Sequence, residues 1–131
     1  MRHAFIRFVC HRLDENSGRR QGLFQVAAEL LDASALAPQD HEELKRLKAW
    51  FNEHLAQPDR FTRSRKSRVE PKAISWFKAS ATEHVSRMHA ICRILSDHGV
   101  ATEVITCSRP GYIVFEDEHQ VAAEPSAETT T

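Results

Sequence analysis

The longest regular spacing of apolar residues runs from Pro71 to Gly99. Apolar side chains recur there every three or four residues, which predicts one amphipathic helix of about seven turns with a buried face. Pro71 suits the first turn of such a helix, and Gly99 suits the position just beyond its end. The predicted buried face comprises Ile74, Phe77, Ala81, His84, Val85, Met88, Ile91, Cys92 and Leu95.

Shorter patterns before this stretch predict one strand and two helices. Residues 3–12 alternate so that one face is wholly apolar, which is typical of a strand. Residues 19–31 show helical spacing after a cluster of turn-forming residues. A second helix is expected to begin at Pro38 and to end before Pro58, with Leu44, Leu47, Phe51 and Leu55 along its apolar stripe.

Beyond Gly99 the period changes from about 3.6 to 2, which predicts a β-meander. Strands are expected at residues 100–107 and within residues 112–123, and the second stretch is divided by a hairpin loop at Asp117-Glu118. The order is therefore β-α-α-α-β-β-β, an α+β fold. Three helices should pack on one face of a small, mostly antiparallel sheet built from the first strand and the meander. We expect a single domain over residues 1–125 and a frayed polar tail over 126–131.

Composition fits one globular domain and excludes several classes of protein. The 131 residues are 41% hydrophobic and 27% charged, which is typical of neither a disordered nor a fibrous chain. No window approaches the roughly 20 apolar residues of a membrane helix, and the first residues lack the features of a secretory signal. Three widely separated cysteines in apolar runs indicate small core residues, as expected for a cytoplasmic protein. No cofactor is expected, and the four glycines form no phosphate-binding loop.

Charge is segregated along the chain although the net charge is zero. Residues 60–72 contain six basic residues against Glu70, and residues 116–131 contain five acidic residues and no basic one. Clustered arginines bind phosphate or carboxylate in bidentate fashion, and a nearby aromatic ring can stack on a base. The candidate partner-binding residues in this exposed loop, residues 59–70, are Arg60, Phe61, Arg63, Arg65, Lys66 and Arg68.

The partner of this loop is left open by the sequence. An acidic protein, a nucleic acid and a second copy of the chain all present the required negative charge. A plainer alternative is a solvated loop that contacts the acidic C-terminal segment of its own chain. No helix-turn-helix, zinc-finger or ribonucleoprotein signature is present to decide between these.

The acidic run Glu116, Asp117, Glu118 and His119 is the candidate metal site, since carboxylates and imidazole are common metal ligands. Such a site would support metal-assisted hydrolysis of a phosphate ester. Alternation along a strand, however, turns neighbouring side chains to opposite faces. A solvated hairpin tip is therefore the favoured interpretation, and no metal is expected.

Three further residues admit two interpretations each. His84 lies beside an apolar stripe, where a histidine bonded to the backbone or to a carboxylate is favoured over a general base. Trp50 and Trp76 flank helical stripes, so they either widen the core or form a contact patch, and the core is favoured.

The C-terminal part of the chain resembles a group of small uncharacterised bacterial proteins. The resemblance begins at Lys72, covers nearly half of the chain, and implies a bacterial cytosolic protein with no catalytic residue to carry over. The residues that carry it are Ile74–Lys78, Glu83-His84, His98–Val100, Arg109–Glu118 and Gln120–Pro125.

Taken together, these patterns favour a small non-enzymatic binding or regulatory module that contacts a macromolecule through its arginine-rich loop. A metal-assisted phosphate-ester hydrolase and a nucleic-acid-binding protein are the two alternatives.

Overall fold

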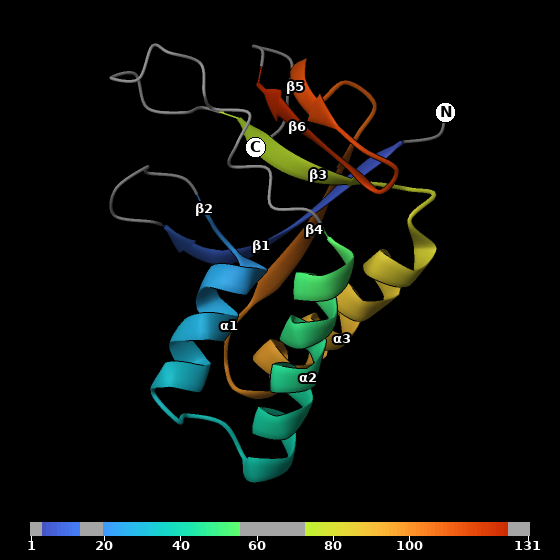
Figure 1. Ribbon diagram of the computed structural model, residues 1–131. Coiled ribbons are helices and arrows are strands. Elements are labelled where there is room, and N and C mark those ends of the chain that lie inside the picture. The colour runs from blue at the N-terminus through green and yellow to red at the C-terminus, as the bar shows by residue number, and fades with distance from the viewer. Residues whose placement is uncertain (1–3, 14–19, 56–72, 126–131) are drawn as a thin grey trace, which may run out of the picture. The chain divides into compact units, whose positions relative to one another are not determined.

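The computed structural model describes residues 4–13, 20–55 and 73–125 and confirms the α+β class. The predicted basic loop at 59–70 and the predicted tail at 126–131 lie outside these residues. In chain order the elements are β1 (Phe5–Leu13), β2 (Arg20–Gly22), α1 (Leu23–Asp32), α2 (Pro38–His54), β3 (Ile74–Lys78), α3 (Thr82–Asp97), β4 (Thr102–Cys107), β5 (Tyr112–Glu116) and β6 (Gln120–Glu124) (Figure 1).

The chain divides into two compact units, which are described separately. The strand unit contains residues 1–7, 55–82 and 105–131, and the helical unit contains residues 8–54 and 83–104. The prediction of one domain over residues 1–125 stays a prediction.

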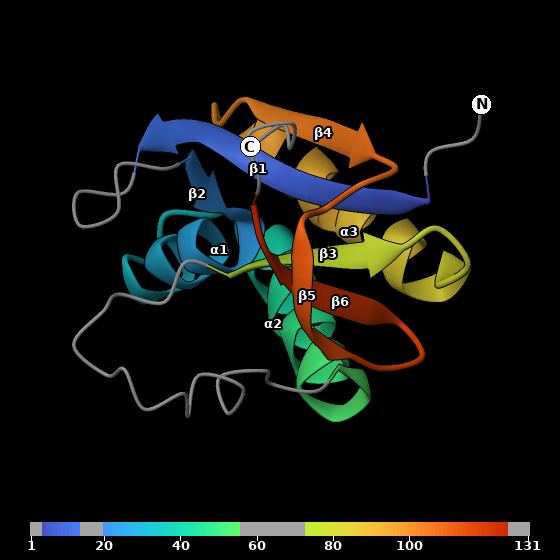
Figure 2. The ribbon, with the colours of Figure 1, turned by 90° about the horizontal axis from the view of Figure 1, so that it is seen from above.

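The strand unit is an antiparallel ladder in which β6 lies between β3 and β5 (Figure 2). Trp76 of β3 pairs with Val121 of β6, and Phe77 pairs with Ile6 at the start of β1. The edge strand β5 carries an extra residue, Val114, because the register of its pairing with β6 shifts between Ile113 and Phe115. The core of this unit includes Ile74, Trp76, Phe77, Ile105, Val121, Ala122 and Ala123.

The helical unit contains α1, α2 and most of α3, together with β2 and parts of β1 and β4. Helices α1 and α2 form an antiparallel hairpin (Figure 1). Strand β1 pairs with β2 at Val9 and Gly22, and its His11 N–H donates to the carbonyl of Ala101 at 3.0 Å. The core of this unit includes Phe8, Val9, Cys10, Leu23, Val26, Ala27, Leu44, Phe51, Met88, Ile91, Ile94 and Leu95.

The prediction of one helix from Pro71 to Gly99 is wrong over its first part, where residues 74–78 form strand β3. Ile74 and Phe77 are three residues apart, so they match a helical stripe, yet this run is rich in the β-branched and aromatic residues that favour strands. Backbone pairing with β6 on one side and β1 on the other satisfies its peptide groups. Helix α3 therefore begins only at Thr82.

The end of the predicted helix is confirmed. Helix α3 ends at Asp97, and Gly99 has a φ of +86°, the left-handed conformation that glycine adopts at low cost. The Val100 N–H donates to the carbonyl of Leu95 at 2.9 Å. This bond satisfies a carbonyl that the end of a helix leaves without an intrahelical partner.

The predicted helix over residues 19–31 is wrong at its start, because residues 20–22 form the short strand β2. Gly22 is the N-cap of α1, with φ of −78° and ψ of 162°, and the helix begins at Leu23. The two additional strands, β2 and β3, change the predicted order to β-β-α-α-β-α-β-β-β.

None of the helices in the described residues combines the length and the apolar content that crossing a bilayer requires.

Candidate functional sites

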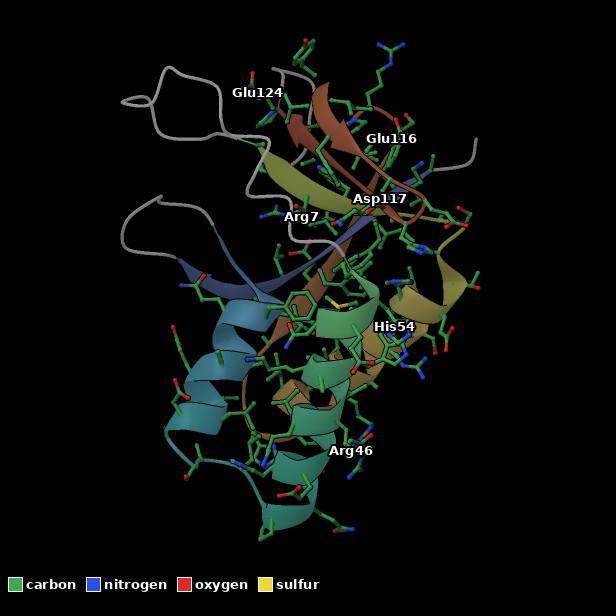
Figure 3. All side chains as sticks on the ribbon, in the orientation of Figure 1. Arg7, Arg46, His54, Glu116, Asp117 and Glu124 are labelled. Atoms are coloured by element: carbon green, nitrogen blue, oxygen red, sulfur yellow. The ribbon has the colours of Figure 1, made fainter. Side chains whose placement is uncertain are left out.

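The two sets of residues that the sequence nominated fall differently in the structure. The arginine-rich set, Arg60, Phe61, Arg63, Arg65, Lys66 and Arg68, lies outside the described residues. The acidic set, Glu116, Asp117, Glu118 and His119, is described in full at the β5–β6 hairpin of the strand unit. Figure 3 labels Glu116 and Asp117 of this set.

Asp117 organises the hairpin turn through its side chain. Its Oδ1 accepts hydrogen bonds from the backbone N–H groups of His119 and Gln120 at 2.8 and 2.9 Å. The Asp117 N–H donates to the Gln120 carbonyl at 2.9 Å, so these two residues close the hairpin. The loop proper is therefore Glu118-His119, one residue later than predicted, because an aspartate in this position substitutes for a backbone acceptor.

These contacts also fix the charge of Asp117. Burial alone would raise the pKa of its carboxyl group. The hydrogen bonds from His119 N–H, Gln120 N–H and the Gln120 side-chain amide, together with the nearby imidazole of His119, outweigh burial and lower the pKa below its ordinary value of 3.8. The carboxylate is thus ionised and engaged within its own turn.

The other two carboxylates of the hairpin point to different surroundings. Glu116 forms an ion pair with Lys78 of β3 at 2.6 Å, whereas the Glu118 side chain is 87% exposed and lies 3.8 Å from His119. Over the described residues, no three histidine, cysteine or acidic side chains gather closely enough to hold a metal ion. The arrangement stabilises a turn and does not converge on one point.

We expect Asp117→Ala to lower the free energy of unfolding by about 1–2 kcal/mol, because two backbone N–H groups lose their acceptor. Asp117→Asn keeps an acceptor oxygen and should cost clearly less. Urea denaturation at neutral pH measures both. Glu118→Ala is the matched control, and its stability should stay within about 0.5 kcal/mol of the wild type.

The lowered pKa of Asp117 also predicts that the free energy of unfolding depends on pH. A lowered folded-state pKa contributes stability above the pKa of the unfolded aspartate, and this contribution is lost as the pH falls through the folded-state value. The advantage of the wild type over Asp117→Asn should therefore shrink below pH 3.8. In the substitution test at neutral pH, equal stability of Asp117→Ala and Glu118→Ala would contradict the role of the Asp117 carboxylate in the turn.

The helical unit contains a second cluster, which the sequence did not reveal. Trp50 of α2 contacts four side chains of α2 and α3 through aromatic or cation–π geometry. Its ring is stacked on His54 at a centroid distance of 4.4 Å with planes 13° apart, and Cζ of Arg87 lies 4.1 Å from the ring centroid. Phe51 and His84 approach the same ring edge-on at 5.0 and 4.8 Å.

His84 holds the two helices together. It is 5% exposed, and its Nε2–H donates to the carbonyl of His54, the last residue of α2, at 2.9 Å. Because a carbonyl oxygen only accepts, this bond places a proton on Nε2. The structure confirms the expectation of a buried histidine bonded to backbone, and the bond satisfies a carbonyl at a helix end.

His54 itself is exposed but held in place. Its Nδ1–H donates to the carbonyl of Trp50 at 2.8 Å, and its ring lies flat on the indole. Arg87 of α3, whose Cζ lies over the indole, donates from Nη1–H to the Glu83 carboxylate at 2.7 Å. The cluster thus presents an imidazole and a guanidinium that each contact the indole, and the charge of the guanidinium is partly balanced by Glu83.

The spacings within each helix were visible in the sequence. Trp50 and His54, like Glu83 and Arg87, are four residues apart and so share a helix face. What the sequence could not show is that these two faces meet, since that depends on the packing of α2 on α3.

The cysteines do not supply a nucleophile. Burial raises the pKa of the Cys92 thiol despite a hydrogen bond with Thr102 that acts in the opposite direction. Burial likewise raises the pKa of Cys107 against a backbone hydrogen bond from Arg109. Cys10 is fully buried. Thiols that are buried or that have a raised pKa are poor nucleophiles, in accord with the predicted structural role of these cysteines.

Comparisons of the whole chain with models of protein families, with curated proteins and with solved structures found no match.

Proposed function

We propose that this protein is a non-enzymatic binding module that contacts an anionic macromolecule through its arginine-rich segment, Arg60 to Arg68. The observation that carries the proposal is the segregation of charge. Residues 56–72 hold six basic and two acidic residues, whereas the rest of the chain holds twelve basic and sixteen acidic residues. A basic segment joined to an acidic remainder is suited to recruit negative partners at one place only.

The type of basic residue supports recognition over simple solubility. Between Arg60 and Arg68 there are four arginines and one lysine. The planar guanidinium donates two parallel hydrogen bonds to a phosphate or carboxylate, which an ammonium group does not. The partner is accordingly a nucleic acid or an acidic protein surface, and the acidic C-terminal segment of a second copy belongs to the latter class.

The geometry of the acidic hairpin weighs against the hydrolase alternative. Asp117 is engaged by three hydrogen-bond donors, and Glu116 is paired with Lys78. Metal binding there would require both carboxylates to give up these contacts. We also propose a cytosolic location, because its three cysteines are free and lie in partly or fully buried positions. A bacterial source is what the resemblance of its C-terminal part implies.

The test compares a charge reversal with a charge-conserving control. The variant Arg63→Glu/Arg65→Glu/Arg68→Glu should lose at least about tenfold in affinity for fluorescent oligouridylate or polyglutamate at low salt. The variant with lysine at the same three positions keeps the charge and should retain most of the binding. Fluorescence anisotropy measures both.

Thermal unfolding of the two variants shows whether the fold is intact, and melting temperatures near that of the wild type are expected. Undiminished binding of both polyanions by the charge-reversed variant would contradict the proposal.

A further inference from the structure

A stack of planar groups on Trp50 lies near the C-terminal end of α2 in the helical unit. Three planar groups participate: the guanidinium of Arg87, the indole of Trp50 and the imidazole of His54. Figure 3 shows His54 beside the end of α2. Only five residues of the chain separate it from Arg60, the first residue of the arginine-rich segment.

The imidazole is preorganised for stacking. One face of the ring lies on the indole at 4.4 Å, and Nδ1–H is engaged by the Trp50 carbonyl at 2.8 Å, so its rotation is restricted from two directions. The residue as a whole is exposed. The exposure of His54 leaves imidazole surface open to a flat ligand, and little conformational entropy of the side chain is lost when the ligand stacks there.

We propose that His54, supported by Trp50 and Arg87, is a stacking platform for a nucleobase, and that the anionic partner of this protein is single-stranded nucleic acid. This inference rests on the proposed function and specifies its partner. Single strands are bound in many proteins by aromatic rings that stack on bases, combined with basic residues that neutralise phosphates.

The charges around the platform favour a base over an acidic peptide. Glu83 contacts Arg87, and exposed Glu53 precedes His54 in the same helix, about 100° away around the axis. The group that an acidic residue would place on the imidazole is itself a carboxylate, close to these two carboxylates. A nucleobase is uncharged and offers a π-face that can stack on an aromatic ring.

The test uses three fluorescent probes on the full chain: a twelve-residue oligouridylate, an abasic phosphodiester oligomer of the same length, and polyglutamate. His54→Ala should weaken oligouridylate binding about fivefold or more and leave binding of the abasic oligomer unchanged, since only the first probe has a base to stack. His54→Phe restores a flat ring and should remain within about twofold of the wild type. Asn52→Ala, an exposed change in the same helix, is the control.

The remaining outcomes separate the inference from the proposed function. If His54→Ala weakens both oligomers equally, or neither, the platform is refuted while charge-driven binding stands. If polyglutamate binds and oligouridylate does not, the partner is an acidic protein and the nucleobase platform is refuted. If the wild type binds none of the three probes, both the platform and the proposed function are refuted.

Discussion

Gly111→Ala is expected to lower the free energy of unfolding by about 3–5 kcal/mol, which is a large share of the stability of a domain of this size. Gly111 precedes β5 and has a φ of +115°, where a side chain is strained by about 1–3 kcal/mol. A Cβ atom at this position would lie 2.0 Å from the carbonyl oxygen of Glu124. Because the obstructing atom belongs to the backbone, β5 and β6 would have to separate at their end, at a further cost.

Alanine substitutions at two other glycines distinguish the cost of backbone strain from the cost of the clash with Glu124. Gly99 has a φ of +86° but nothing within 4 Å of an added Cβ, so Gly99→Ala should cost only the backbone strain, about 1 kcal/mol. Gly22 has neither a positive φ nor a close neighbour, so Gly22→Ala should change stability by a few tenths of a kcal/mol. Chemical denaturation should show the largest loss of stability for Gly111→Ala, a smaller loss for Gly99→Ala and the smallest for Gly22→Ala. A Gly111→Ala protein as stable as Gly99→Ala would contradict the close approach of Gly111 to Glu124.

Trp76→Ala is expected to cost about 3–5 kcal/mol, because Trp76 is 1% exposed and alanine leaves a large cavity. Trp76→Phe should cost less than about 1.5 kcal/mol. Phenylalanine keeps a ring in place and removes an indole N–H that is buried without an acceptor among the described residues. Burial of the unsatisfied indole N–H destabilises the folded state by about 1–3 kcal/mol. Its removal therefore offsets part of the packing free energy that the smaller ring loses.

Ser75→Ala is the control for this pair of variants. Ser75 is exposed between buried Ile74 and Trp76, as the period of a strand requires. Its replacement should change stability by no more than about 0.5 kcal/mol, whereas equal effects at positions 75 and 76 would contradict the burial of this strand.

The α+β class and most elements could be predicted because they depend on local periodicity. Helix α2, the end of α3 at Gly99 and the strands of the meander each carry an unambiguous local signal. Residues 74–78 do not, since Ile74 and Phe77 suit either a helical stripe or a strand. What decides the conformation there is pairing with β6 and β1, and those partners lie far away in the chain.

The candidate sites also divide into features with a local sequence signal and features that depend on the folded structure. The charge segregation is a property of the sequence and was visible there, and so was the structural role of His84. The engagement of Asp117 was not visible, because its acceptor role depends on the exact turn that forms one residue later than predicted. The stack of His54, Trp50 and Arg87 depends on two helices meeting, which no single helix pattern encodes.

If the arginine-rich segment holds a macromolecular partner, capture of that partner from bacterial lysate should depend on its arginines. Tagged wild-type protein and the Arg63→Glu/Arg65→Glu/Arg68→Glu variant are compared at low and high salt, with and without nuclease. We predict that the wild type retains nucleic acid at low salt, that nuclease or high salt removes it, and that the variant retains none. Retention of the same material by both proteins, unaffected by salt, would contradict the claim.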